Sequence, residues 1–85
     1  MTPADIRGEI LAFVRVPGSV SDDFDLRRDG AVDSLRFIQL LAHLEARTGA
    51  AIDLSEVDPE RLTDVGVLSR HVAKQAAQVA SVADR

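Results

Sequence analysis

A single serine stands where a polar stretch meets a periodic apolar segment, in the triplet Asp33-Ser34-Leu35. Serine at the start of a helix is typically a cap, because its hydroxyl accepts hydrogen bonds from unpaired backbone amides. The position also suits an attached anion, since those first amides point outward at the positive end of the helix dipole. Ser34 has no base of its own, so an outside enzyme would have to activate it. Two hypotheses follow for Ser34: a structural cap, or the point where a chemical group is attached.

Other arrangements of reactive side chains fit known chemistry poorly. A calcium loop counted from Asp23 would place Arg27 at a ligand position and Ser34 where a glutamate should clamp the ion. His43 and His71 lie on different predicted helices, without a metal-binding partner at the required spacing. A serine hydrolase would need a G-x-S-x-G turn after a strand, and the sequence offers neither. We therefore expect no catalytic residue and no metal site, and the chain is predicted not to be an enzyme.

Length and composition further limit the classes of protein to which the chain could belong. The 85 residues predict a single domain, 1–85, with little room to enclose a substrate. Cysteine is absent, which excludes disulfides and cysteine-bound metals, and the net charge of −4 disfavours nucleic-acid partners. No apolar run approaches the roughly 20 residues of a membrane span. The N-terminal segment shows no secretion signal, so a cytoplasmic location is expected.

Helices are predicted on both sides of a long polar connection. The first begins after Thr2, a capping residue followed by Pro3, and is ended by Pro17-Gly18. Residues 17–33 lack helical periodicity, and a connection of this length inside a small domain is most often functional. This connection leads directly to Ser34.

The segment after the connection has a clear helical period. A helix is predicted over 34–48, with Gly49 as its left-handed stop. Its inward face is expected to hold Leu35, Ile38, Leu41, Ala42 and Leu44, with Phe37 beside them. A narrow stripe cannot bury so many apolar residues, so at least one of Phe37 and Leu41 should stay partly exposed.

The sequence after this helix predicts one short and one long helix. Residues 55–62 can make only a turn or two of helix, and Thr63 or Asp64 should cap the last helix. The buried stripe of that helix is predicted to be Val65, Leu68, Val72 and Ala76. The predicted fold is all-α, with three main helices, one short helix and a long first connection.

The sequence DGAVDSLRFIQLLAHLEARTGAAI resembles the modification region of the acyl carrier protein superfamily. The likeness rests on D-S-L after a long loop, then an apolar helix ending in L-E and a glycine. It continues through DLSEVDPERLTDVGVLSRHV, and so extends from about Ile6 to Val72 and beyond. The resemblance implies an acyl-carrier-like bundle. It also implies that Ser34, flanked by the motif residues Asp33 and Leu35, carries a covalent 4′-phosphopantetheine arm whose thiol holds its cargo as a thioester.

The resemblance also implies partners. A magnesium-dependent phosphopantetheinyl transferase would attach the arm from coenzyme A, and an adenylating ligase would load it. A downstream transferase or condensing enzyme would then take the cargo, and we expect the carrier to be a monomer. Apolar groups beside the arm are plausible contacts for these enzymes, so Arg36, Phe37 and Leu41 are predicted as the partner surface. Arg36 is expected to project beside the arm, either as a tolerated surface charge or as the partner of an acidic group on the ligase.

The residues around the D-S-L motif indicate which branch of the superfamily the chain resembles. Carriers of bacterial fatty acid synthesis usually show G-A-D-S-L and a strongly acidic helix. In this chain Ala31-Val32 precedes Asp33, and Arg36 and Arg47 against Glu45 give segment 34–48 a formal charge of +1. The Gly-Gly pair usual in peptidyl carriers is missing. The pattern D-G-x-x-D-S-L with FIQLL is more similar to stand-alone aminoacyl carriers, including the D-alanyl group.

We therefore predict a carrier of an aminoacyl or small acyl group. Two alternatives stay open. One is an acyl carrier protein of fatty acid or polyketide synthesis. The other, of a different class, is an unmodified helical interaction module in which Ser34 is only a cap.

Overall fold

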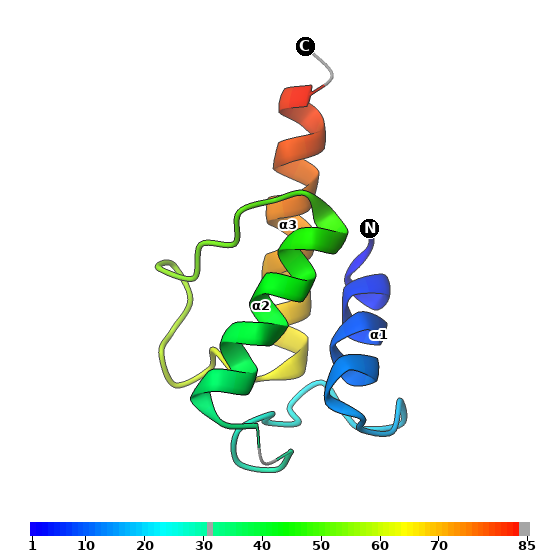
Figure 1. Cartoon of the computed structure of the whole chain (residues 1–85), viewed down its shortest axis with the longest axis vertical. Coiled ribbons are helices and arrows are strands. Elements are labelled where there is room, and N and C mark those ends of the chain that lie inside the picture. Colours follow the sequence, from blue (N-terminus) through cyan, green and yellow to red (C-terminus); the bar gives the residue numbers. More distant parts are fainter. Residues whose placement is uncertain (31, 84–85) are drawn as a thin grey trace.

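The chain folds into three helices, α1 (Pro3–Val14), α2 (Ser34–Thr48) and α3 (Val65–Ala83), shown in Figure 1. The computed structural model describes the backbone of residues 1–30 and 32–83, and the side chains of these residues as far as Val79. Helix α1 packs against both α2 and α3. The described residues contain no strand, only an isolated bridge between Asp25 and Asp64. The all-α prediction with a long first connection is confirmed.

The helix ends follow from capping residues. The Thr2 hydroxyl accepts a hydrogen bond from the Asp5 amide at 3.2 Å, and the Asp5 carboxylate accepts one from the Thr2 amide at 2.9 Å. Helix α1 stops where Arg15 adopts a left-handed conformation, ahead of the predicted breaker Pro17. Helix α2 ends at Gly49 in the same conformation, as predicted. The bounds of α2 agree with the prediction from the sequence.

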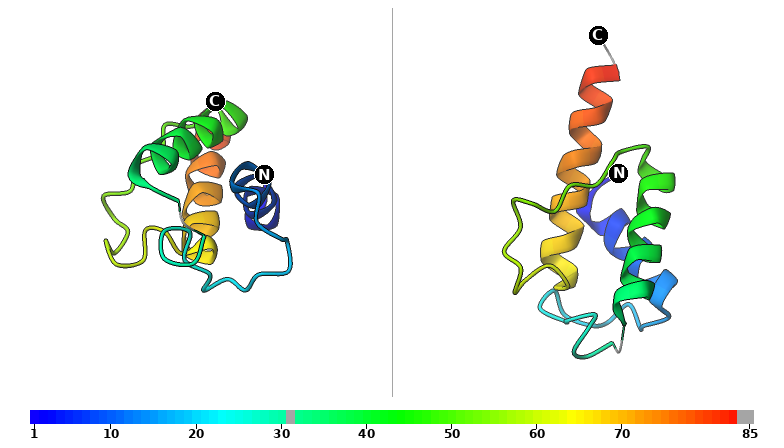
Figure 2. Two further views of the ribbon diagram at one scale, coloured as in Figure 1. Left: turned by 60° about the horizontal axis from the view of Figure 1, so that its bottom comes forward. Right: turned by 60° about the vertical axis from the view of Figure 1, so that its left-hand side comes forward.

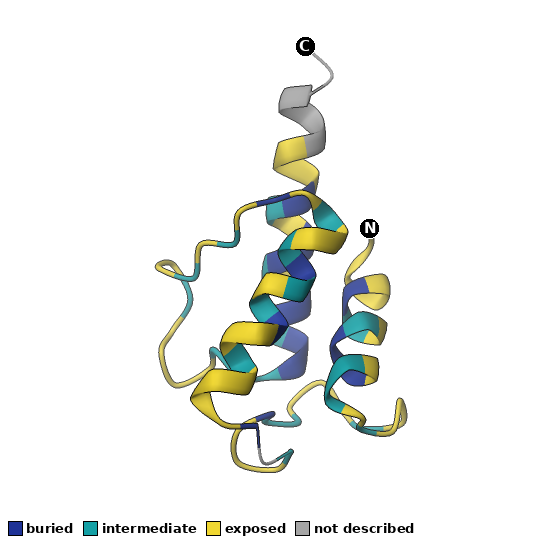
Figure 3. Cartoon of the chain, viewed as in Figure 1, coloured by how far each residue is buried: buried dark blue, intermediate teal, exposed yellow. Residues whose placement is uncertain are grey.

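The core draws on all three helices and also on the first connection. Leu26 and Val32, both in that connection, are buried together with apolar residues of the helices. Figure 3 shows buried positions on all three helices and in the first connection. The buried hydrophobic cluster is Ile6, Ile10, Leu11, Leu26, Val32, Leu40, Leu44, Val65, Leu68, Val72 and Ala73. The predicted inward stripe of the last helix is therefore correct, and Ala76 is buried too. Because the connection supplies core residues, it is packed rather than loose.

Backbone hydrogen bonds join the first connection to the start of α3. The Val65 amide donates to the Phe24 carbonyl at 3.0 Å, and the Gly66 amide donates to the Asp22 carbonyl at 2.8 Å. The Leu26 amide donates to the Thr63 carbonyl at 2.9 Å in the opposite direction. The first two bonds satisfy amides that the start of α3 leaves unpaired. Among the described residues, the side chain of neither Thr63 nor Asp64 accepts a hydrogen bond from these amides, so the cap expected there is not confirmed. The connection therefore crosses the end where α2 and α3 begin (Figure 2).

The short helix predicted within 55–62 is not confirmed, because this segment forms separate turns. The Val57 amide bonds to the Leu54 carbonyl at 3.0 Å, and the Arg61 amide bonds to the Asp58 carbonyl at 2.8 Å. Both are bonds between residues three apart, and no continuous helix develops from them. Starting a helix is costly, and a segment this short cannot recover that cost by extending it. The pairing of Thr63 with the first connection further fixes its end in a non-helical conformation.

The contact between Gly66 and Asp22 generates a stability prediction. A methyl group on Gly66 would lie 2.7 Å from Asp22 Cβ and 3.0 Å from its carbonyl oxygen. Gly66→Ala should therefore push the connection off α3 and lower the free energy of unfolding by about 1–3 kcal/mol. The matched control is Gly8→Ala in α1, where nothing lies within 4 Å. It should raise that free energy by up to about 1 kcal/mol. Urea titrations measure both values, and a Gly66→Ala protein as stable as Gly8→Ala would contradict the packing described.

Candidate functional site

Ser34 is the first residue of α2, and the residue before it caps the helix. Asp33 is extended, its carboxylate accepts a hydrogen bond from the Arg36 amide at 2.8 Å, and its carbonyl accepts one from the Phe37 amide at 2.9 Å. The hypothesis of Ser34 as the cap is therefore wrong, because a capping residue must precede the helix and Ser34 is already helical. Ser34 is exposed, and its hydroxyl has no hydrogen-bond partner among the described residues. The hydroxyl is available for chemistry.

An open cleft of about 700 Å³ lies beside Ser34, and we call it the Ser34 cleft. Its walls come from the end of the first connection, the first turns of α2 and residues 59–63. Its apolar lining is Val32, Phe37, Ile38, Pro59 and Leu62. Its polar lining, besides Ser34, is Asp25, Arg27, Arg28, Asp33, Glu60 and Thr63. The cleft thus offers a mixed surface to a group attached at Ser34.

Asp25 ties two walls of the Ser34 cleft together. One of its carboxylate oxygens accepts hydrogen bonds from the amides of Arg27 at 2.9 Å and Arg28 at 3.0 Å. The same oxygen accepts a hydrogen bond from the Thr63 hydroxyl at 2.7 Å, across the cleft. Partial burial raises the pKa of Asp25, but these three hydrogen bonds outweigh it, so the pKa lies below its usual value. Asp25 is therefore an anion at neutral pH with its charge already satisfied.

The exposed face of α2 next to Ser34 is apolar. Leu35 is 65% exposed and Ile38 is 63% exposed, while Leu40 and Leu44 are fully buried. The predicted inward face is thus wrong for Leu35, Ile38 and Ala42, all of which are exposed. Phe37 and Leu41, both predicted partner-surface residues, are half-buried against the core. Sequence reasoning missed the exposure of Leu35 and Ile38 because α2 carries two apolar stripes, and periodicity does not say which one faces inward.

Arg36 reaches toward α1. Its guanidinium carbon lies 4.1 Å from the centre of the Phe13 ring, and its Nη2 donates to the Phe13 carbonyl at 2.9 Å. A cation is favourable there, because the last carbonyls of α1 lack helical partners and the C-terminal end of the helix is negative. Arg36 is still solvent-exposed. The sequence placed it beside the attachment point, whereas the structure shows it linking α2 to α1.

The link between α1 and α2 continues along one face of α2. His43 stacks on Phe13 with 5.0 Å between ring centroids, and its Nε2 lies 3.1 Å from a carboxylate oxygen of Glu9. The other Glu9 oxygen accepts a hydrogen bond from Arg47 Nε at 2.9 Å. The hydrogen bond with His43 and the charge of Arg47 hold the pKa of Glu9 below its usual value. Together with Arg36, these contacts fix the orientation of α2 and so the direction of Ser34.

No helix among the residues that the structure describes is long and apolar enough to cross a membrane. No group of three or more His, Asp or Glu side chains among these residues is placed to hold a metal ion.

Comparison with known proteins supplies the family. Residues 4–72 match the family described as phosphopantetheine attachment site. No curated protein and no solved structure matches the chain. Proteins with this domain are non-catalytic carriers that hold a 4′-phosphopantetheine group on a serine and work with a phosphopantetheinyl transferase and biosynthetic enzymes. Because the match covers most of the 85 residues, the chain belongs to the phosphopantetheine attachment site family.

Proposed function

We propose that the chain is a discrete carrier that holds an aminoacyl or small acyl group as a thioester on a 4′-phosphopantetheine arm attached to Ser34. The observation that carries this proposal is the free hydroxyl of Ser34 at the first position of a helix that Asp33 already caps. Replacing the hydroxyl proton with a phosphodiester breaks no recorded hydrogen bond of the fold. Residues 1–85 would then act as one carrier domain, as a cytoplasmic monomer.

The surroundings of Ser34 are compatible with the arm. We propose that the transferase activates the Ser34 hydroxyl. Ser34 Oγ would attack the phosphorus next to the pantetheine in coenzyme A, the pyrophosphate P–O bond would break, and adenosine 3′,5′-bisphosphate would leave while the serine proton passes to a base. One oxygen of the adjacent Asp33 carboxylate accepts a hydrogen bond from the Arg36 amide and caps α2, so we assign Asp33 a structural role and not that of the base. The base and the magnesium ion would come from the transferase. The arm, once attached, supplies a thiol that holds the cargo, while the chain supplies an anchor at the mouth of the Ser34 cleft.

The proposed cargo class is supported by the face of α2 that partners would meet. This face carries the exposed side chains of Leu35 and Ile38, and its first turn contains no acidic residue. Enzymes that recognise strongly acidic carriers through basic patches would find little charge to bind there. This supports an adenylating ligase of the aminoacyl or small-acyl type, followed by a downstream transferase or condensing enzyme.

The docking surface for these enzymes is proposed to surround Ser34 on α2. Leu35 and Ile38 offer the largest exposed apolar groups of the helix, and Phe37 and Leu41 contribute their accessible edges. Exposed apolar groups in contact with one another mark protein-binding surfaces. Arg36 supplies a charge at the border of this surface.

Modification is predicted at Ser34 alone. Incubation of the purified protein with coenzyme A, magnesium and a broad-specificity phosphopantetheinyl transferase should add one phosphopantetheine group, measured as intact mass. Ser34→Ala should gain none, because the nucleophilic oxygen is gone. Ser55→Ala is the matched control and should be modified like the wild type, since Ser55 does not begin a helix. Addition to the Ser34→Ala protein would disprove the assignment.

We predict that Asp33 caps α2 and that Ser34 is the residue that is modified. Asp33→Ala should lower the free energy of unfolding by about 0.5–2 kcal/mol, because the Arg36 amide loses its acceptor. Ser34→Ala should change it by no more than about 0.5 kcal/mol, since its hydroxyl has no recorded partner in the described residues. Thermal and urea unfolding of the two unmodified variants compare these values. The proposal requires that the larger loss belongs to Asp33→Ala.

Arg36 is predicted to contribute to recognition by the ligase. Arg36→Glu should slow loading by lowering the association rate, most strongly at low salt, because exposed charges act mainly on encounter. Loading kinetics across a salt series measure this effect. The control is Phe13→Leu, which removes the ring beneath the guanidinium but keeps the charge. If Phe13→Leu slows loading equally, Arg36 acts through its contact with α1 and a direct contact with the ligase is refuted.

A further inference from the structure

The Ser34 cleft contains a cation whose role the fold does not explain. We propose that Arg27 binds the phosphodiester that joins the arm to Ser34 and so holds the base of the arm against the carrier. This inference rests on the proposed attachment to Ser34. It assigns a specific residue of the first connection to the attached group, independently of the cargo and of the partner enzymes.

The backbone of Arg27 is fixed although its side chain is exposed. Its amide donates to the Asp25 carboxylate at 2.9 Å, and that carboxylate is itself anchored by Thr63. The Asp25 carbonyl accepts bonds from the amides of Asp29 at 2.7 Å and Gly30 at 3.2 Å, which close the turn around Arg27. The guanidinium therefore extends from a rigid base, so little backbone freedom is lost when it binds an anion.

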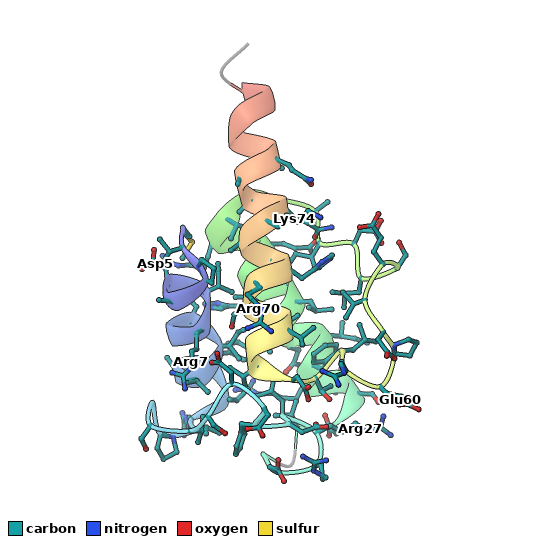
Figure 4. The ribbon with its side chains drawn as sticks, turned by 180° about the vertical axis from the view of Figure 1, so that it is seen from behind. Asp5, Arg7, Arg27, Glu60, Arg70 and Lys74 are labelled. Carbon is teal, nitrogen blue, oxygen red and sulfur yellow. The ribbon has the colours of Figure 1, made fainter. Side chains whose placement is uncertain are left out.

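Most other charges in the Ser34 cleft are already engaged. Arg28 donates two hydrogen bonds to Asp29, from Nη2 at 3.1 Å and from Nε at 3.3 Å. Asp25 accepts three hydrogen bonds, and Asp33 caps α2. For the guanidinium of Arg27 no hydrogen bond or ion pair is recorded among the described residues, and the same holds for the carboxylate of Glu60. Figure 4 shows Arg27 and Glu60 at the same end of the molecule.

A phosphodiester on Ser34 needs a cation nearby. It would stand next to the Asp33 carboxylate, and like charges at such short range repel. Arg27 lines the same cleft as Ser34, and a guanidinium can donate two parallel hydrogen bonds to phosphate oxygens. Because Arg28 is held by Asp29, Arg27 is the cation of the Ser34 cleft that can move to the phosphate without breaking an ion pair.

Nuclear magnetic resonance of the modified and unmodified protein tests the inference. The phosphorus resonance of the modified protein should shift in Arg27→Gln relative to the wild type, and should be unchanged in Arg28→Gln, the matched control. The side-chain Nε–Hε signal of Arg27 should move when the wild type is modified. Both effects should largely disappear in about 1 M salt, where charges are screened beyond about 3 Å.

Three results would overturn the inference. The first is an identical phosphorus resonance in the wild type and Arg27→Gln. The second is an Arg27 signal that responds to Glu60→Gln in the unmodified protein but not to modification, which would make Glu60 its partner. The third is an intact mass that shows no arm on the wild-type protein. This result would reject the proposed attachment to Ser34 itself, so the mass is measured before the resonances. A shift in Arg27→Gln alone, lost at high salt, supports the inference.

Discussion

The pairing of the first connection with the start of α3 is the constraint on which the site depends. A helix start leaves amides unpaired, and here the carbonyls of Phe24 and Asp22 accept bonds from the amides of Val65 and Gly66. The same pairing buries Leu26, which is fully covered in the core. An apolar anchor and a row of backbone hydrogen bonds thus convert a long polar connection into a rigid frame. Ser34 follows immediately after this frame.

The orientation of α2 has a second, independent source. Its buried leucines fix the helix against the core. On another face of α2, Arg36 contacts Phe13 and Arg47 contacts Glu9, and these contacts orient α2 relative to α1. These are polar and aromatic contacts at the solvent boundary, where ion pairs alone contribute little. Their effect is geometric: they select one rotation of α2, and that rotation leaves a second apolar stripe facing solvent.

Local signals in the sequence predicted the helices well, and contacts between distant residues explain where prediction failed. Thr2, Gly49 and the periodicity of segment 34–48 are local features, and the bounds of α2 followed from them. The inward face of α2 could not follow from period alone, since two stripes compete. The end of the segment 55–62 is fixed by Thr63, which pairs with Asp25, 38 positions away in the sequence. The acceptor of Arg36 is also distant in sequence, because Phe13 lies 23 positions away on α1. For Ser34, the sequence indicated the position but not that Asp33 would take over the cap.

The carboxylate of Asp25 makes the Ser34 cleft one of the acid-sensitive parts of the fold, beside the contact of Glu9 with α2. A group whose pKa is lowered by folding contributes stability above its unfolded pKa, and this contribution is lost as the pH falls through the folded value. Protonation of Asp25 would weaken the bond to Thr63 and the turn at Arg27 together, because one oxygen accepts all three hydrogen bonds. Acid would therefore loosen these two walls from each other, and would also weaken the Glu9 contacts that link α1 to α2. Acid would thus act on the end of the bundle that carries Ser34 as well as on the packing between its helices.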